Sequence, residues 1–219
     1  MITRSDQIKN FFEEMQASMK KSANIYVIGG GVLLIRGMKS TTKDIDLVVD
    51  SEEEFEEANK VLQHLGFKTK KVSALYERFD LAYQLIRDEF QVDLFCRKVC
   101  SKFQLSKNMV ERSEKILSIG KVNVFLCSNE DIFLFKTMTE RPGDTSDCTG
   151  LIQKGLDWKV VLSEMKYQIK NYGKDIWITW IGERLDLLED QGLNIPIMKD
   201  IDELRVKYFD ELKKRQARK

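Results

Sequence analysis

The stretch Val27–Asp50, VIGGGVLLIRGMKSTTKDIDLVVD, places three glycines after one apolar run and two aspartates inside the next. In its last part, DIDLVVD, Asp44 and Asp46 fall on one face of a strand and the alternating apolar residues fall on the other. A carboxylate in a strand costs free energy unless a metal ion, a basic side chain or water meets it. The stretch therefore predicts a β-strand with an acidic face, for which the rest of the sequence must supply a partner.

The two aspartates and a third acid are candidate metal ligands. At positions i and i+2 of a strand, the carboxylates of Asp44 and Asp46 lie within about 7 Å of each other, so they repel unless a cation joins them. Magnesium prefers hard oxygen ligands of this kind. Asp93, in the apolar run FQVDLFC, again points away from its apolar neighbours and would permit two ions. The alternative, independent aspartates on the surface, stays open.

The glycines indicate a backbone that comes close to a ligand. A glycine turn between a strand and a helix exposes N–H groups that suit a phosphate, although a tight turn with positive φ would also use glycine. The P-loop motif is excluded because Gly31 is followed by VLL. The dinucleotide fingerprint fails at its third glycine, where Leu34 stands, and only Asp50 keeps that alternative open. The candidate phosphate-binding residues are Gly29, Gly30 and Gly31.

The composition excludes several kinds of chemistry. The chain has 219 residues, a net charge of +1 and one histidine, His64, so histidine-based triads and zinc sites have nothing to be built from. The four cysteines show no CxxC spacing, and we expect them to be reduced. No apolar run is long enough to cross a bilayer and no secretory signal begins the chain, so we expect a cytoplasmic protein with no membrane partner.

The order of elements predicts two lobes. Strands at 24–30, 44–50 and 122–128, and a pair of strands within 81–99, alternate with helical patterns up to Ser128. After Ser128 the pattern is helical throughout, with Trp177 and Trp180 spaced for the core. We therefore predict an α/β (α+β) fold, with a mixed sheet flanked by helices in residues 1–128 and an all-helical lobe in residues 129–219.

Residues 25–155 contain a series of glycines, threonines, basic residues and acids in a fixed order. The order is Gly29, Gly30, Arg36, Thr41, Thr42, Asp44, Asp46, Asp93, Lys136, Arg141, Asp144 and Asp147. This order resembles the DNA polymerase β-like nucleotidyltransferase superfamily, whose signature is a strand, a Gly-Gly or Gly-Ser turn, a short helix, an Asp-x-Asp strand and a third acid. The likeness is closest to small prokaryotic members, including the nucleotidyltransferase toxins of abortive-infection systems. Those members also carry a helix with a lysine, followed by an Arg-x-x-Asp-x-x-Asp element.

The resemblance implies transfer of a nucleoside monophosphate from a nucleoside triphosphate to a hydroxyl acceptor. It implies that Asp44, Asp46 and Asp93 hold two Mg²⁺ ions and that Asp93 doubles as general base. The acceptor would be an RNA end such as that of tRNA, a protein, or a small molecule such as an aminoglycoside. The nucleotide would be bound by the glycine turn together with Arg36, Thr42, Lys136 and Arg141.

Several alternatives stay open at this level. Lys136 could be a solvated helix lysine, Arg141 could pair with Asp144 or Asp147, and Arg36 could cap the short helix after the glycines. The whole chain could also be a catalytically silent module of a toxin–antitoxin type system. Such a module would bind a nucleotide or a partner protein, for example a cognate antitoxin-like protein.

Overall fold

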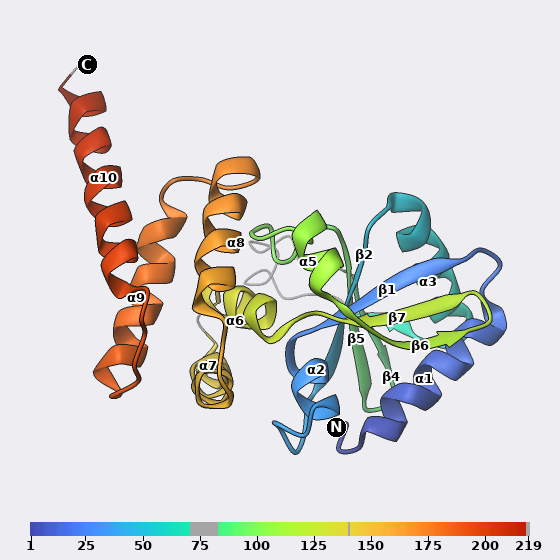
Figure 1. Cartoon of the computed structure of the whole chain (residues 1–219). Helices are drawn as coiled ribbons and strands as arrows, with labels where there is room; N and C mark the ends of the chain where they lie inside the picture. Colours follow the sequence, from blue (N-terminus) through green and yellow to red (C-terminus); the bar gives the residue numbers. More distant parts are fainter. Residues whose placement is uncertain (71–82, 140, 218–219) are drawn as a thin grey trace. The chain divides into compact units, whose positions relative to one another are not determined.

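A computed structural model describes residues 1–70, 83–139 and 141–217 (Figure 1). The chain divides into two compact units, Met1–Ser128 and Asn129–Lys219. The first unit is a mixed sheet with helices and the second is helical, so the predicted fold class is confirmed. The two strands expected within 81–99 are present as Tyr83–Arg87 and Phe90–Cys96, whereas residues 81–82 lie outside the described part. A short strand, Lys68–Thr69, precedes them.

The described strands of the first unit form one seven-stranded sheet with the order β3-β4-β5-β2-β1-β7-β6. The central strands β1 and β2 pair antiparallel, while β2 with β5 and β1 with β7 pair parallel. The remaining neighbours, β3–β4, β4–β5 and β6–β7, are antiparallel. The strands are β1 Ala23–Ile28, β2 Asp44–Val49, β3 Lys68–Thr69, β4 Tyr83–Arg87, β5 Phe90–Cys96, β6 Glu114–Ile119 and β7 Val122–Leu126.

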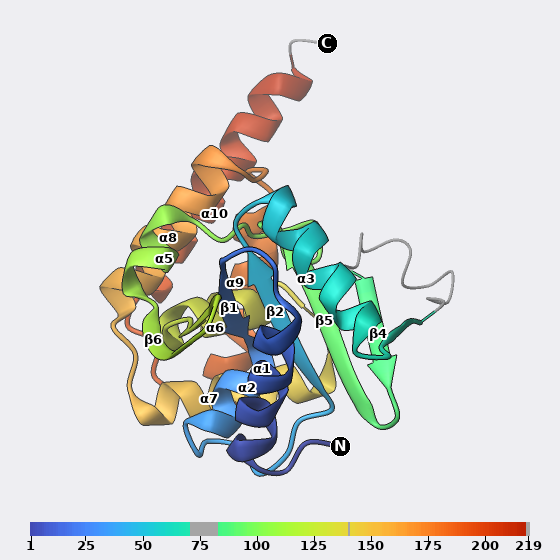
Figure 2. The ribbon, with the colours of Figure 1, turned by 90° about the vertical axis from the view of Figure 1, so that its right-hand side faces the viewer.

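Helices α1 (Ser5–Ser18) and α3 (Glu52–His64) lie side by side over one face of this sheet (Figure 2). The stacking of Phe11 on Phe90, with ring centroids 5.3 Å apart, identifies that face as the apolar one. On this face, Ile45 and Leu47 are fully buried. Helix α3 begins after an N-cap serine, Ser51, whose hydroxyl accepts from the Glu54 N–H at 3.2 Å.

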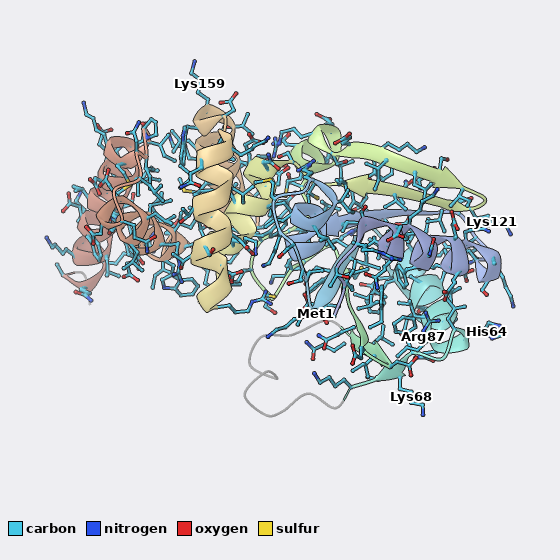
Figure 3. All side chains as sticks on the ribbon, turned by 90° about the horizontal axis from the view of Figure 1, so that it is seen from below. Met1, His64, Lys68, Arg87, Lys121 and Lys159 are labelled. Carbon is cyan, nitrogen blue, oxygen red and sulfur yellow. The ribbon has the colours of Figure 1, made fainter. Side chains whose placement is uncertain are left out.

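Two further helices complete the first unit, α2 (Gly29–Ile35) and α5 (Lys107–Arg112). The sequence did not predict α5 or β6. Strand β6 lies at the edge of the sheet and is partly exposed along its length, so its sequence lacks the alternation that a buried face imposes. His64 is exposed on α3 (Figure 3), and the four cysteines are free.

The second unit consists of helices joined by short turns. Trp177 is buried in it, but Trp180 is 41% exposed, so the prediction that both belong to the core is wrong for Trp180. Residues three apart on a helix differ by about 60° in direction, which is enough to place one of them at the rim of the buried stripe. Over the described residues, no helix is both long and apolar enough to span a membrane. The helices are α6 Asn129–Thr137, α7 Pro142–Lys154, α8 Trp158–Asn171, α9 Trp177–Asp190 and α10 Met198–Gln216.

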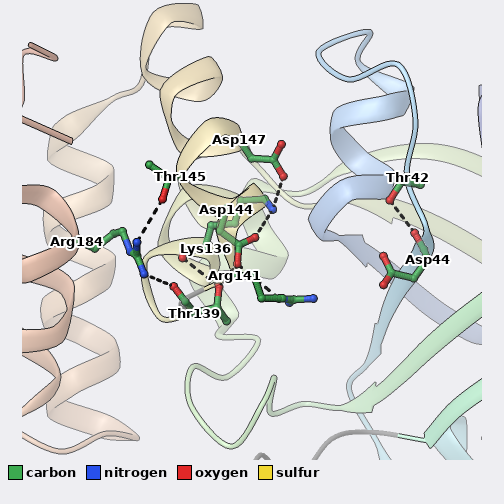
Figure 4. A network of polar contacts seen from close by, with 9 residues as sticks. All are labelled: Thr42, Asp44, Lys136, Thr139, Arg141, Asp144, Thr145, Asp147 and Arg184. Atoms are coloured by element: carbon green, nitrogen blue, oxygen red, sulfur yellow. Dashed lines mark hydrogen bonds and ion pairs between the residues drawn. The ribbon is translucent and has the colours of Figure 1, made fainter. Parts of the chain in front are cut away.

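A buried ion cluster joins α6 to α7 (Figure 4). The Lys136 ammonium lies 2.9 Å from Asp144 Oδ1 and 2.6 Å from Asp147 Oδ2. The Thr139 hydroxyl donates to the other oxygen of Asp144, and Arg141 Nε lies 3.5 Å from that oxygen. These groups compensate each other's charge, which a buried ion requires.

The pKa values in the cluster follow from this compensation. Burial alone would lower the pKa of Lys136, but the Asp144 and Asp147 carboxylates outweigh it and raise that pKa above its usual range. Burial likewise opposes ionisation of Asp144, yet Lys136, Thr139 and Arg141 together lower its pKa. The lysine's contribution to stability is therefore lost only as pH rises through its raised pKa, and the aspartate's only as pH falls through its lowered pKa. Between these limits the cluster stabilises the second unit.

Replacing Lys136 with Met should lower the free energy of unfolding by roughly 3–5 kcal/mol near pH 7, because two buried carboxylates lose their cation. The difference from wild type should shrink as the pH is lowered, because Asp144 without the Lys136 cation takes up its proton at a higher pH than it does in the wild type. Urea denaturation at several pH values measures both effects. The control is Lys166→Met, which removes a half-exposed pair with Asp200 at 3.9 Å and should cost at most about 1 kcal/mol. Equal losses in the two variants would contradict the role given to the cluster.

Candidate functional site

The register between β2 and β5 brings the acids together. In this parallel pair Asp46 stands opposite Asp93, and Asp44 stands opposite Gln91. Neighbouring strands lie about 4.8 Å apart and paired residues point to the same face, so the side chains of Asp46 and Asp93 are direct neighbours. Asp44, two residues before Asp46, shares that face. The three predicted acids therefore occupy one face of the sheet, opposite the face that α1 and α3 cover.

Asp46 and Asp93 are buried, with exposed fractions of 8% and 3%, whereas Asp44 is partly exposed. A buried carboxylate needs hydrogen-bond donors. For Asp93 these include two glutamines: Gln91 Nε2 donates to Oδ1 at 3.0 Å, and Gln84 Nε2 donates to Oδ2 at 3.3 Å. Sequence reasoning missed both, although the spacing of Gln91, two residues before Asp93, already puts it on the acidic face.

The glycine turn packs against Asp46. Gly29 has φ +65°, and a Cβ atom there would come 2.1 Å from Asp46 Oδ2, so a side chain at this position would have to displace the Asp46 carboxylate. At Gly30 a Cβ atom would come 2.4 Å from the Thr42 hydroxyl, and at Gly31 it would come 3.2 Å from Val27. Gly29 and Gly30 therefore pack directly against Asp46 and Thr42.

Thr42 and Arg36 make contacts within the first unit. Thr42 is buried, its backbone pairs with Ile2 in an isolated bridge, and its hydroxyl donates to the Asp44 carbonyl at 3.1 Å. Arg36, at the end of α2, donates to the Cys127 carbonyl at 3.0 Å and lies 3.6 Å from Glu114 Oε2. Both residues thus fix the segment that connects the glycine turn to the acids.

Lys136 and Arg141 lie in the second unit and differ in accessibility. Lys136 is 8% exposed, so the alternative of a solvated lysine is wrong, and its ammonium is held by Asp144 and Asp147. The Arg141 side chain is 60% exposed and lies near Asp144, as its structural alternative predicted. The Arg141 side chain is therefore accessible to a ligand. Lys136 could bind a ligand only by giving up its contact with the carboxylate of Asp144 or Asp147.

The acids fit a divalent cation in donor type and in backbone position. Carboxylate oxygens on one face of two paired strands are what Mg²⁺ or Mn²⁺ uses. Among the residues that the structure describes, however, no three or more His, Cys, Asp or Glu side chains are arranged to hold a metal ion. To hold a magnesium ion, Asp44, Asp46 and Asp93 would therefore need water and substrate oxygens to complete the coordination shell, as is usual for this ion.

Known structures resemble the chain distantly. ANT(2")-Ia, solved in complex with adenylyl-2"-tobramycin, is 12% identical, with a TM-score of 0.48, over 75% of this chain and 98% of that one. TM1012 from Thermotoga maritima, which its description assigns provisionally to the nucleotidyltransferases, is 16% identical, with a TM-score of 0.41, over 62% of this chain and 84% of that one. Comparison with curated proteins gives no match.

A family model gives the assignment. The model described as "Nucleotidyltransferase of unknown function (DUF6036)" matches residues 6–176. The match includes the glycine turn, the three acids, and the Lys136 and Arg141 element. The chain therefore belongs to this family of nucleotidyltransferases.

Proposed function

We propose that the protein is a magnesium-dependent enzyme that transfers a nucleoside monophosphate from a nucleoside triphosphate to a hydroxyl group. The observation that supports this best is the β2–β5 register, which sets Asp46 beside Asp93, with Asp44 on the same face. Two like charges that are neighbours in a sheet are costly in a purely structural role. In a member of a nucleotidyltransferase family, a cation that arrives with the substrate explains them.

In this proposal Asp44, Asp46 and Asp93 hold two Mg²⁺ ions. When bound, the ions neutralise phosphate charge and lower the pKa of the attacking hydroxyl. The acceptor oxygen forms a bond to the α-phosphorus, the bond from that phosphorus to the bridging oxygen breaks, and pyrophosphate leaves with the electron pair. A carboxylate oxygen of Asp93 takes the hydroxyl proton.

The remaining candidates would position the triphosphate. The backbone N–H groups of Gly29–Gly31 face the β- and γ-phosphates, and the absence of side chains there lets phosphate oxygens approach. Arg141 supplies positive charge from an exposed position. A direct contact from Lys136 requires phosphate to replace one carboxylate of its cluster. Arg36 and Thr42 support the turn and the start of β2 through the contacts described above.

The acceptor would be an RNA end, a protein or a small molecule such as an aminoglycoside. The sequence motifs do not decide among these acceptors. The rival function is a silent module that binds a nucleotide or an antitoxin-like protein without transfer. A silent module would have the same fold but would need no metal ion at Asp44, Asp46 and Asp93.

Transfer is tested by incubating the protein with each labelled nucleoside triphosphate, Mg²⁺, and total RNA or cell extract, and then asking which molecule becomes labelled. Asp46→Asn should reduce labelling about 100-fold or more, because one carboxylate ligand is lost. It should leave the Tm unchanged or raised without metal, since repulsion from Asp93 is relieved. Asp50→Asn is the control: Asp50 follows the same strand, is exposed and pairs with Arg97 at 3.3 Å. If the Asp46 and Asp50 variants label equally well, the proposed site is wrong.

Gly29 and Gly37 allow a matched test of the glycine turn. Both have positive φ, +65° and +67°, but a Cβ atom at Gly37 would meet nothing within 4 Å. Alanine should cost about 1–2 kcal/mol of stability at either position. Only Gly29→Ala should also displace Asp46 and weaken binding of a magnesium–triphosphate complex, by at least 10-fold. Calorimetric titration of both variants measures this, and equal affinities would show that the turn does not shape the site.

Magnesium and the triphosphate should bind cooperatively, because the acids complete a magnesium shell only together with phosphate oxygens. Each ligand should tighten the other by the same factor. The triphosphate should therefore raise the Tm much more with Mg²⁺ than with EDTA. Calorimetry with a non-hydrolysable triphosphate checks the coupling directly. Equal nucleotide affinity with and without Mg²⁺ would favour the silent module.

A further inference from the structure

The carboxylate of Asp93 receives a hydrogen bond on each of its oxygens, from the amides of Gln91 and Gln84. With 3% of Asp93 exposed, bulk water contributes little to its solvation. Amide donors on both oxygens restrict rotation about the last side-chain bond. The two glutamines thus contribute to the orientation of this carboxylate.

The strand order shows from which direction each donor comes. Gln84 is the partner of Asp93 on β4, and Asp46 is its partner on β2. Because β5 lies between β4 and β2, Gln84 and Asp46 flank Asp93 from opposite sides. Gln91 approaches along β5 itself. Neither donor strand is β2, so hydrogen bonding by the glutamines is compatible with a cation between Asp93 and Asp46.

Gln91 is itself oriented by a cation. Lys70 Nζ donates to Gln91 Oε1 at 3.4 Å, and the Lys70 backbone N–H donates to the Gln84 carbonyl at 2.8 Å. An ammonium group can only donate, so it contacts the oxygen end of the amide and leaves the NH₂ end toward Asp93. Lys70, just after β3, therefore donates to Gln91 of β5, Gln91 donates to Asp93, and Gln84 of β4 donates to Asp93 from the other side.

We propose that Gln84 and Gln91 are positioning residues that hold the Asp93 carboxylate for a divalent cation shared with Asp46. This inference rests on the proposed function, because it requires Asp93 to be a metal ligand. A metal-binding carboxylate that is already held in place loses less conformational freedom when the ion binds. Hydrogen bonds to metal-binding carboxylates commonly change metal affinity by about 10–100-fold when they are removed.

The test uses Gln84→Met and Gln91→Met, which keep the length of the side chain and remove its donor. Mn²⁺ is titrated into each full-length variant in the presence of a non-hydrolysable triphosphate, and the affinity is read by calorimetry and by the electron paramagnetic resonance signal of free Mn²⁺. Each variant should bind Mn²⁺ about 10-fold more weakly than wild type. Gln63→Met is the control, because Gln63 is an exposed residue of α3 whose amide bonds to Asn59 at 3.4 Å. It should bind Mn²⁺ like wild type.

A merely structural role of the glutamines would give a different result. The variants would then melt at lower temperature, but at a temperature where all are folded they would bind Mn²⁺ with wild-type affinity. That outcome would overturn the positioning role and leave the proposed function intact. Absence of Mn²⁺ binding by the wild type in the presence of the triphosphate would instead overturn both. Weaker binding by the two variants alone, with Gln63→Met unchanged, supports the inference.

Discussion

The parallel pairing of β2 with β5 is the constraint on which the candidate site depends. Its register is set on the apolar face, where Ile45 stands opposite Val92 and Leu47 opposite Leu94, all fully buried. A slip of one residue would turn every side chain of the strand over and bury Asp46 in that core. The same pairing that makes the core therefore places Asp46 beside Asp93 on the other face. The spacing of the acids is a consequence of hydrophobic packing one residue away.

Both units contain buried charged side chains, and each surrounds them with different contacts. In the second unit, Lys136 lies between Asp144 and Asp147 within one cluster, which is how a protein makes a buried ion tolerable. In the first unit, the carboxylates of Asp46 and Asp93 are neighbours, and the contacts of Asp93 include the neutral amides of Gln84 and Gln91. The ion cluster contributes to stability, whereas the acidic pair is where the proposed cation would bind.

The main strands and helices could be predicted from the sequence, because their apolar residues recur with the period of a strand or of a helix. The alternation in Asp44–Asp50 predicted both the strand and its acidic face, and the glycines followed by apolar residues predicted the turn into α2. The sequence alone could not predict features that depend on contacts between segments distant in the chain. The support of Asp93 by Gln84 requires knowing that β4 pairs with β5 in one particular register. The burial of Lys136 depends on how α7 folds back on α6, since a lysine on a helix is by itself more often solvated.

The β2–β5 pairing also has a consequence for how the protein comes to be folded. Its partners are distant in the chain, as are those of β1 and β7, where Ala23 pairs with Val122. Pairings of this kind close long loops before they gain contact energy, so they form slowly compared with a hairpin or a helix. A nascent chain that ends before β5 has the glycine turn, Asp44 and Asp46, but it has no partner strand to bring a third acid beside them. The acidic face is thus assembled only in chains that have synthesised β5 and completed this long-range pairing.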